Sequence, residues 1–130
     1  MEDSIFSKII RGDIPSHKIY EDERTYAFLD IYPQTEGHAL VVPKTQVEFL
    51  WDLDEEDYRA ICETAKKVAL RLREVLGVPY VGEKVVGVDI PHAHIQLIPF
   101  THVDEYSRFA DAAKEPDHAH LAALAAKLRL

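Results

Sequence analysis

Residues 91–100, PHAHIQLIPF, place two histidines and a glutamine on every second position. In an extended strand, His92, His94 and Gln96 would point to one face, about 6.6 Å from one to the next. The apolar residues that alternate with them would point to the core: Ala93, Ile95 and Leu97. This alternation predicts a sheet with one packed face and one polar face that meets a ligand. Spacing alone leaves two alternatives open, a surface strand with incidental polar residues and a metal site completed by ligands from elsewhere.

Further strands and a short helix are predicted from the sequence that precedes this stretch. These elements are a helix over residues 4–11 and strands over residues 17–22, 25–31, 37–44 and 80–88. The first two strands are expected to form a hairpin with a tight turn at Glu23–Arg24. The third strand should stop at Pro43, because proline donates no hydrogen bond to a sheet.

The clearest predicted element is a helix over about residues 54–76, where apolar side chains recur at steps of three and four. Asp54 is a suitable N-cap, and Gly77 follows the last turn. Cys62 falls on the apolar stripe and is predicted to be a small core residue. With strands before and after one long helix, residues 1–130 are expected to form a single α+β domain with an antiparallel sheet of about five strands.

The sequence becomes polar and charged beyond Phe100, and a final helix is predicted from about residue 117. Residues 101–130 are therefore expected to be a C-terminal extension that ends in a helix with a docking surface of leucine and alanine. His118 and His120 are two positions apart, so a helix points them about 200° apart, which argues against a metal site there.

Composition narrows the class of protein. A chain of 130 residues with 47% hydrophobic content is long enough for one ordinary core. The formal net charge of −8 argues against broad contact with nucleic acid, although backbone N–H groups and imidazoles can still hold a small anion locally. The single cysteine, Cys62, fits a reducing cytoplasm. No stretch has the length of a membrane span, and the first residues lack the apolar region of a signal peptide, so a cytoplasmic protein without membrane partners is expected.

Three segments together carry a resemblance to a known family: residues 4–22, SIFSKIIRGDIPSHKIYED; residues 28–44, FLDIYPQTEGHALVVPK; and residues 87–100, GVDIPHAHIQLIPF. They resemble the histidine triad (HIT) superfamily of nucleotide hydrolases and transferases, whose signature is His-φ-His-φ-His-φ-φ with φ apolar. The resemblance runs from Ser4 to about Phe100. It implies a HIT-like fold, a small nucleotide as substrate, and a homodimer whose sheets join across a two-fold axis.

The resemblance assigns roles to the histidines. His94 would attack the α-phosphorus of a nucleotide and form a covalent nucleotidyl-imidazole, which water or another acceptor then resolves. Imidazole suits this role because its ordinary pKa of about 6.5 leaves a neutral lone pair at pH 7. A backbone carbonyl on the same strand would accept a hydrogen bond from the other ring nitrogen. His92 and His38 would lie beside the site as orienting and phosphate-contacting groups.

The remaining pocket residues also follow from the resemblance. Asp30 would accept hydrogen bonds from both ribose hydroxyls, which two carboxylate oxygens suit. Gly87 would let the backbone approach the phosphate. The apolar walls around the base would be Ile5, Phe6, Ile9, Phe28, Leu29 and Ile31. Periodicity alone equally allows these six residues to be plain core, and it gives Lys44 a structural or solvated role.

Three departures from the family pattern bear on chemistry. Gln96 stands where hydrolases usually carry a third histidine, as in the uridylyltransferases and dinucleoside tetraphosphate phosphorylases. An amide can steady a phosphoryl oxygen but cannot protonate a leaving group. Val88 and Asp89 replace two polar phosphate contacts; an ionised Asp89 would repel phosphate, unless it points away, binds an imidazole or holds a metal ion with the substrate. No asparagine matches the family's phosphate-side asparagine on the preceding strand.

The same comparison bears on cofactors. Many bacterial members carry Cys-x-x-Cys and a later histidine as zinc ligands, where this chain has Ser4, Ser7 and Gln46. Hydroxyls and an amide are poor zinc ligands, so no metal and no other cofactor is expected. The predicted function is hydrolysis of a small nucleotide phosphoanhydride or phosphoramidate, best a dinucleoside polyphosphate with adenine. A nucleotidyltransferase or phosphorylase, and a nucleotide-binding module with weak turnover, remain as alternatives.

Overall fold

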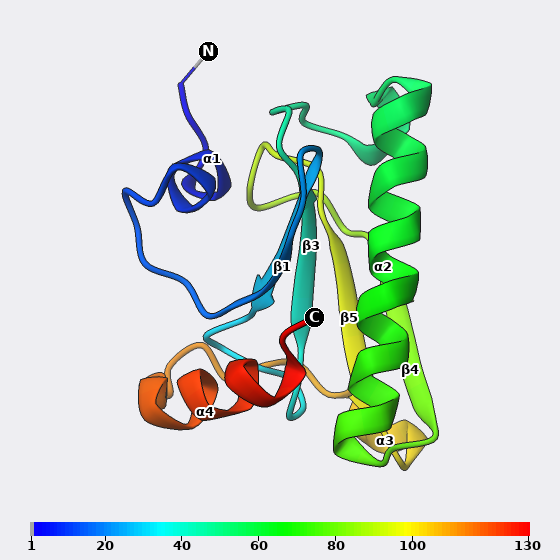
Figure 1. The fold of residues 1–130 in the computed structure, drawn as a ribbon. Coiled ribbons are helices and arrows are strands. Elements are labelled where there is room, and N and C mark those ends of the chain that lie inside the picture. The colour runs from blue at the N-terminus through cyan, green and yellow to red at the C-terminus, as the bar shows by residue number, and fades with distance from the viewer. Residues whose placement is uncertain (1) are drawn as a thin grey trace.

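A computed structural model describes residues 2–130 and forms a five-stranded antiparallel sheet with helices on both faces (Figure 1). The strands lie in the order β1-β2-β3-β5-β4, so β1 and β4 are the edges. The elements in chain order are α1 (Ile5–Arg11), β1 (Lys18–Glu21), β2 (Thr25–Leu29), β3 (Ala39–Pro43), the 3-10 helix η1 (Leu50–Asp52), α2 (Glu55–Leu76), β4 (Tyr80–Lys84), β5 (Ile95–Phe100), α3 (Val103–Ser107) and α4 (His118–Leu128). The predicted α+β class and five-stranded antiparallel sheet are confirmed.

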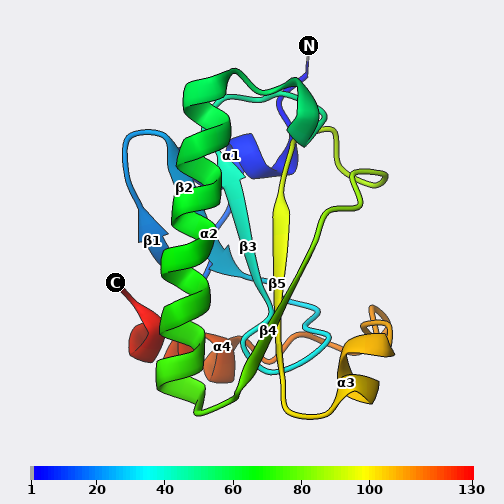
Figure 2. The ribbon, with the colours of Figure 1, turned by 90° about the vertical axis from the view of Figure 1, so that its right-hand side faces the viewer.

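Helix α2 covers one face of the sheet, as Figure 2 shows. Its N-cap, Asp54, accepts a hydrogen bond of 2.8 Å from the backbone N–H of Asp57, and Gly77 ends it at a φ of 67°, which glycine adopts without strain. Helix α4 packs on the same face. The buried core on this face includes Ile19, Ala27, Leu29, Val41, Ile61, Ala65, Val68, Leu72, Ile95, Leu97, Leu121, Leu124 and Leu128.

The opposite face of the sheet carries α1 at one end and Tyr106 of α3 against Gly82 of β4, and is otherwise the polar face. Figure 1 shows α1 and α2 on opposite sides of the strands. A second, smaller cluster packs α1 onto this face: Phe6, Ile9, Tyr26, Phe28, Leu40 and Val42. Because side chains alternate along each strand, the neighbours of these residues point back to the α2 side. We call the face of the sheet opposite α2 the open face.

Two sequence predictions need correction. The predicted strand over residues 91–100 begins only at Ile95. The backbone N–H of Ala93 donates to the carbonyl of Val47, outside the sheet, and this diverts residues 92–94 from the ladder. Cys62 is exposed; the side of α2 that packs into the core carries Ile61, Ala65, Val68 and Leu72 instead.

The C-terminal extension packs on its own chain. The apolar side of α4 joins the core beneath α2 and β1, and α3 lies beside β5. Tyr106 of α3 contacts the open face so closely that a Cβ on Gly82 would lie 2.0 Å from its ring. Within residues 2–130, no helix is both long and apolar enough to cross a membrane.

Candidate active site

The site is built around His94, which lies just before β5. Its Nδ1–H donates a hydrogen bond of 2.8 Å to the carbonyl oxygen of His92. Because a carbonyl only accepts, Nδ1 carries the ring proton and Nε2 keeps its lone pair. No partner for Nε2 exists within residues 2–130, and no buried side-chain nitrogen in this part of the chain is unpaired, so Nε2 is open to solvent. This tautomer suits a nucleophile.

His92 is fully buried and uses both ring nitrogens within the fold. Nε2–H donates to the carbonyl of Pro43 at 2.7 Å, so Nδ1 accepts the hydroxyl hydrogen of Ser4, also at 2.7 Å. The side chain therefore cannot reach a phosphate. The predicted orienting role is consistent with the hydrogen bond between the His92 carbonyl and His94. A contact between the His92 imidazole and a phosphate is not, because both ring nitrogens are already bonded.

His38, which directly precedes β3, and Gln96 of β5 form a hydrogen-bonded pair on the open face. The backbone N–H of Gln34 donates to His38 Nδ1 at 3.0 Å, so Nε2 carries the proton and donates to Gln96 Oε1 at 3.1 Å. Asp30 lies on the other side, with its Oδ2 3.6 Å from His38 Nε2. Asp30 is held by the backbone N–H of Tyr32, which donates to its Oδ1 at 2.8 Å. The structure thus brings together three residues that the sequence analysis had placed in the site: Asp30, His38 and Gln96.

Burial keeps the two supporting imidazoles neutral. Desolvation lowers the pKa of His92 below its ordinary value, and the hydrogen bond to Pro43 only partly opposes this. Burial likewise lowers the pKa of His38, against the opposing pull of the Asp30 carboxylate. A neutral His38 retains one donor and one acceptor, as its two hydrogen bonds require.

The predicted apolar walls divide between the two faces. Phe6 contacts the ring of His94 edge-on, with centroids 5.1 Å apart, and packs against Phe28. Ile9 belongs to the same cluster, whereas Ile5 of α1 is about half exposed. Two of the predicted residues lie elsewhere: Leu29 is in the core under α2, and Ile31 packs against that core from the loop after β2. Strand alternation explains this, since Leu29 directly follows Phe28.

The loop between β4 and β5 carries the predicted phosphate-side residues. Gly87 has a φ of 76°, a conformation that favours glycine, and a Cβ there would meet only Phe49 at 3.8 Å. Asp89 is exposed and forms no hydrogen bond or ion pair with any other described residue. The structure therefore does not join Asp89 to the histidine group.

The positions compared with zinc ligands meet in one hydrogen-bond network beneath His92. Ser7 Oγ–H donates to Gln46 Oε1 at 2.7 Å, and the backbone N–H of Ser4 donates to the same oxygen at 2.9 Å. Ser4 Oγ also accepts the Ser7 backbone N–H at 3.0 Å as the N-cap of α1. Two hydroxyls and an amide do not fit zinc, which takes thiolate, imidazole or carboxylate. Residues 2–130 contain no group of three histidine, cysteine or acidic side chains placed to hold a metal ion.

Lys84 is a site residue that the sequence analysis missed. It pairs with Gln96 across β4 and β5, and its Nζ donates to Gln34 Oε1 at 3.0 Å. Sequence alone does not give the register of two strands, so no pattern linked position 84 to position 96. Lys44, by contrast, pairs with Glu21 of β1 at 2.8 Å.

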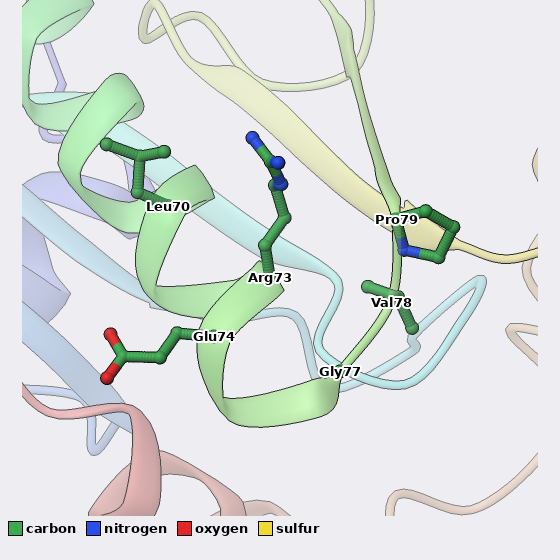
Figure 3. A pocket seen from close by; sticks show the side chains of 6 residues that line it. All are labelled: Leu70, Arg73, Glu74, Gly77, Val78 and Pro79. Atoms are coloured by element: carbon green, nitrogen blue, oxygen red, sulfur yellow. The ribbon is translucent and has the colours of Figure 1, made fainter.

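One hollow elsewhere on the surface lacks comparable chemistry. Figure 3 shows it at the C-terminal end of α2, at the end of the sheet away from α1. It is lined by Leu70, Arg73, Glu74, Gly77, Val78 and Pro79. This lining holds no nucleophile, so this hollow is not a comparable candidate.

Comparisons with known proteins point to one family. The family model described as HIT domain matches residues 11–103. The chain is 39% identical to the protein named hit of Bacillus subtilis over 123 residues, which cover 81% of this chain and 84% of that protein. It is 38% identical over 96 residues to an adenosine 5'-monophosphoramidase of Saccharomyces cerevisiae, covering 73% of this chain and 61% of the yeast protein.

A solved structure shares the whole architecture. A HIT-like protein of Bartonella henselae, described as involved in cell-cycle regulation and solved with an unknown ligand, aligns with a TM-score of 0.83 at 28% identity. The match covers 98% of this chain and 95% of that chain.

Proposed function

Because the chain belongs to the HIT domain family, we propose that it is a nucleotide hydrolase that forms a covalent nucleotidyl adduct on His94. The observation that carries the proposal is the free Nε2 of His94, held in the attacking tautomer by the His92 carbonyl. The yeast relative is an adenosine 5'-monophosphoramidase, which supports an adenine nucleotide as substrate. A phosphoanhydride or phosphoramidate bond at the α-phosphorus is the bond to be cleaved.

The proposed reaction has two steps. Nε2 attacks the α-phosphorus, and the bond to the leaving group breaks with its electron pair on that group. The adduct carries positive charge on the ring, so the imidazole is a good leaving group when water attacks phosphorus. Phe6 and Phe28 would hold the base, Asp30 the ribose hydroxyls and the backbone at Gly87 the phosphate. Gln96, fixed by His38, would donate its amide hydrogens to a phosphoryl oxygen.

Intact-mass measurement after rapid quenching with diadenosine tetraphosphate tests this proposal. The wild-type protein should carry one adenylyl group, and His94→Ala should carry none and lose about 10³-fold or more in turnover. His120→Ala, which removes an exposed imidazole from α4, should keep both adduct and turnover. If His94→Ala retains AMP binding and loses no activity, the protein would instead be a nucleotide-binding module in which His94 is not a nucleophile.

A phosphorylase is the second candidate, and Gln96 favours it by its likeness to the transferase branches. It would use the same adduct and pass the nucleotidyl group to inorganic phosphate. Turnover in the presence of phosphate would then yield a nucleoside diphosphate in place of the monophosphate. Product analysis with and without phosphate separates the two activities.

The assembly is also a proposal. A homodimer joined across the sheets is supported by β4, whose outer edge has no partner strand within residues 2–130. Tyr80 of β4 and Leu70 of α2, both about half exposed, lie beside that edge. The single cysteine supports a cytoplasmic location.

A further inference from the structure

Lys84 shares the open face with the proposed active site. Val81, three residues earlier on β4, packs into the core under α2, so alternation turns Lys84 to the opposite face. Lys84 is paired in register with Gln96, and Gln96 is paired with Leu40 of β3. Side chains that are paired across antiparallel strands stand beside each other on one face. The ammonium group of Lys84 is therefore a neighbour of the Gln96 amide.

A chain of hydrogen bonds fixes this cation in place. Lys84 Nζ donates to Gln34 Oε1 at 3.0 Å. The Gln34 amide is held in turn by α3, since its Nε2 donates to the carbonyls of Glu105 at 3.2 Å and Tyr106 at 2.5 Å. The backbone N–H of Gln34 holds His38, which holds Gln96. One loop residue thus links the cation to the amide beside the nucleophile.

Lys84 has no acidic partner among the described residues, although the chain carries a net charge of −8. Its one hydrogen bond goes to a neutral amide. Burial is the main cause of the lowered pKa of His38, and the positive charge of Lys84 lowers it further, so this charge is felt at the site. A partly buried ammonium group paired only with an amide retains donors for an anionic ligand.

The order of strands places Lys84 on the side away from the base. Phe28, Leu40, Gln96 and Lys84 form one row across β2, β3, β5 and β4. With about 4.8 Å between neighbouring strands, Lys84 lies roughly 14 Å along the sheet from Phe28. Phe6 and Phe28 would hold the base at one end of this row. Groups beyond the α-phosphorus therefore extend toward β4.

We infer that Lys84 and Gln96 form a subsite for a phosphate leaving group, so that the enzyme prefers nucleoside polyphosphates over nucleoside phosphoramidates. This inference rests on the proposed function and names its substrate class. When Nε2 attacks, the P–O bond breaks and its electrons remain on the departing phosphate, which leaves as an anion without needing a proton. Lys84 neutralises that charge, and Gln96 donates a hydrogen bond. An amine leaving group requires a proton, which the Gln96 amide cannot supply.

Steady-state kinetics on two substrates tests the subsite. Lys84→Met should lower kcat/KM for diadenosine tetraphosphate by about ten- to hundredfold, because a hydrogen bond from a charged group is lost. The value for adenosine 5'-phosphoramidate should stay within about twofold of wild type, since that leaving group does not reach the cation. Lys84→Arg should restore most of the lost rate. Lys127→Met removes the same charge from an exposed position on α4 and should change neither substrate.

Equilibrium binding separates this inference from the proposed mechanism. With His94→Ala, which blocks turnover, ADP should bind more tightly than AMP, and the added Lys84→Met change should abolish that difference while leaving AMP affinity unchanged. Equal affinities for AMP and ADP before the Lys84 change would overturn the subsite even if wild type forms the adduct. Conversely, a normal ADP preference with no adduct on His94 would refute the mechanism and retain the anion subsite. Equal losses on both substrates in Lys84→Met would also sink the inference.

Discussion

The three polar side chains at positions 92, 94 and 96 do different work because their partners differ. His92 spends both ring nitrogens on Pro43 and Ser4, so its contribution is a rigid backbone carbonyl. That carbonyl sets the tautomer of His94 and leaves one lone pair free. Gln96 is oriented by His38 and can donate only amide hydrogens. A proton donor for the leaving group is therefore what this group lacks.

Restoring that donor should change the substrate preference. Gln96→His should raise turnover of adenosine 5'-phosphoramidate by about tenfold or more, because general acid catalysis typically contributes about 10²–10⁴-fold. Turnover of diadenosine tetraphosphate should change little, since phosphate leaves without a proton. The comparison uses single-turnover rates on both substrates. Gln96→Asn, an amide that cannot donate a catalytic proton, should gain on neither, and equal gains on both substrates for Gln96→His would refute the leaving-group argument.

Buried neutral imidazoles also make stability depend on pH. Burial lowers the pKa values of His38 and His92, so below about pH 6.5 the unfolded chain binds protons that the folded chain does not. The contribution of these two rings to the free energy of unfolding therefore has its full value above that pH and falls as the pH drops below it. Each imidazole contributes at most about 1.4 kcal/mol per pH unit. Urea unfolding from about pH 7.5 to about pH 5.5 measures the slope.

A single variant provides the control for this pH dependence. Burial also lowers the pKa of His17, so His38→Gln removes one of three imidazoles that contribute to the slope and should reduce the slope. His102→Gln, at an exposed position, should leave the slope unchanged. A wild-type free energy of unfolding that stays flat between these pH values would show that neither ring is kept neutral by the fold.

Helices and strands were more predictable than the paths between them. The periodicity of α2, its Asp54 cap and the stop at Gly77 are local signals, and the structure follows them. The start of β5 was not predictable, because the bond from Ala93 to Val47 joins segments distant in sequence. Strand register, also non-local, concealed Lys84. Asp30, His38 and Gln96 could be grouped in advance only through the family motif.

Helix α1 begins in a hydrogen-bond network that ties the helix to the site. Ser4 caps α1 and also donates to His92, so the helix that carries Phe6 is joined to the ring beneath the nucleophile. Gln46 closes the network from the loop after β3. These hydrogen bonds connect α1, the loop after β3 and the segment before β5. None of the three side chains from Ser4, Ser7 and Gln46 is a good zinc ligand.

Purified protein should therefore hold no stoichiometric zinc. Metal analysis by mass spectrometry should give far less than one zinc per chain, and a chelator should not shift the melting temperature, because no folding energy depends on the metal. A variant with Ser4→Cys, Ser7→Cys and Gln46→His should acquire zinc, since His92 would complete a set of two thiolates and two imidazoles. Stoichiometric zinc in wild type would overturn the expectation, and the variant shows that the assay detects such a site.

The molecule as a whole has one closed face and one open face. Helices α2 and α4 cover the first with an apolar core, while the second holds the candidate site between α1 and α3. The C-terminal extension contributes to both, since α4 closes the core and α3 anchors Gln34 beside Lys84. Among residues 2–130, no strand pairs with the outer edge of β4, whereas the backbone N–H of Leu130 donates to the carbonyl of Ile19 in the other edge strand, β1.

The outer edge of β4 leads to the prediction for the assembly. An exposed strand edge invites pairing with a second copy, and Leu70 and Tyr80 lie beside this edge. Cys62 is exposed on the same helix as Leu70. In the proposed homodimer, Leu70→Glu would bury a carboxylate without a partner and should raise the dissociation constant by about tenfold or more. Light scattering across a dilution series measures the mass. Val103→Glu, at an exposed apolar position on α3, should leave the dimer intact.

Cys62 supplies an independent readout of the same interface, because it is the chain's single cysteine. In the wild-type dimer its thiol should react slowly with a disulfide reagent at high protein concentration and faster on dilution. In Leu70→Glu it should react fast at every concentration, since the weakened dimer would no longer cover this side of α2. A wild-type protein that is monomeric throughout would refute the homodimer. A dimer whose mass and thiol reactivity ignore Leu70→Glu would move the interface away from β4 and α2.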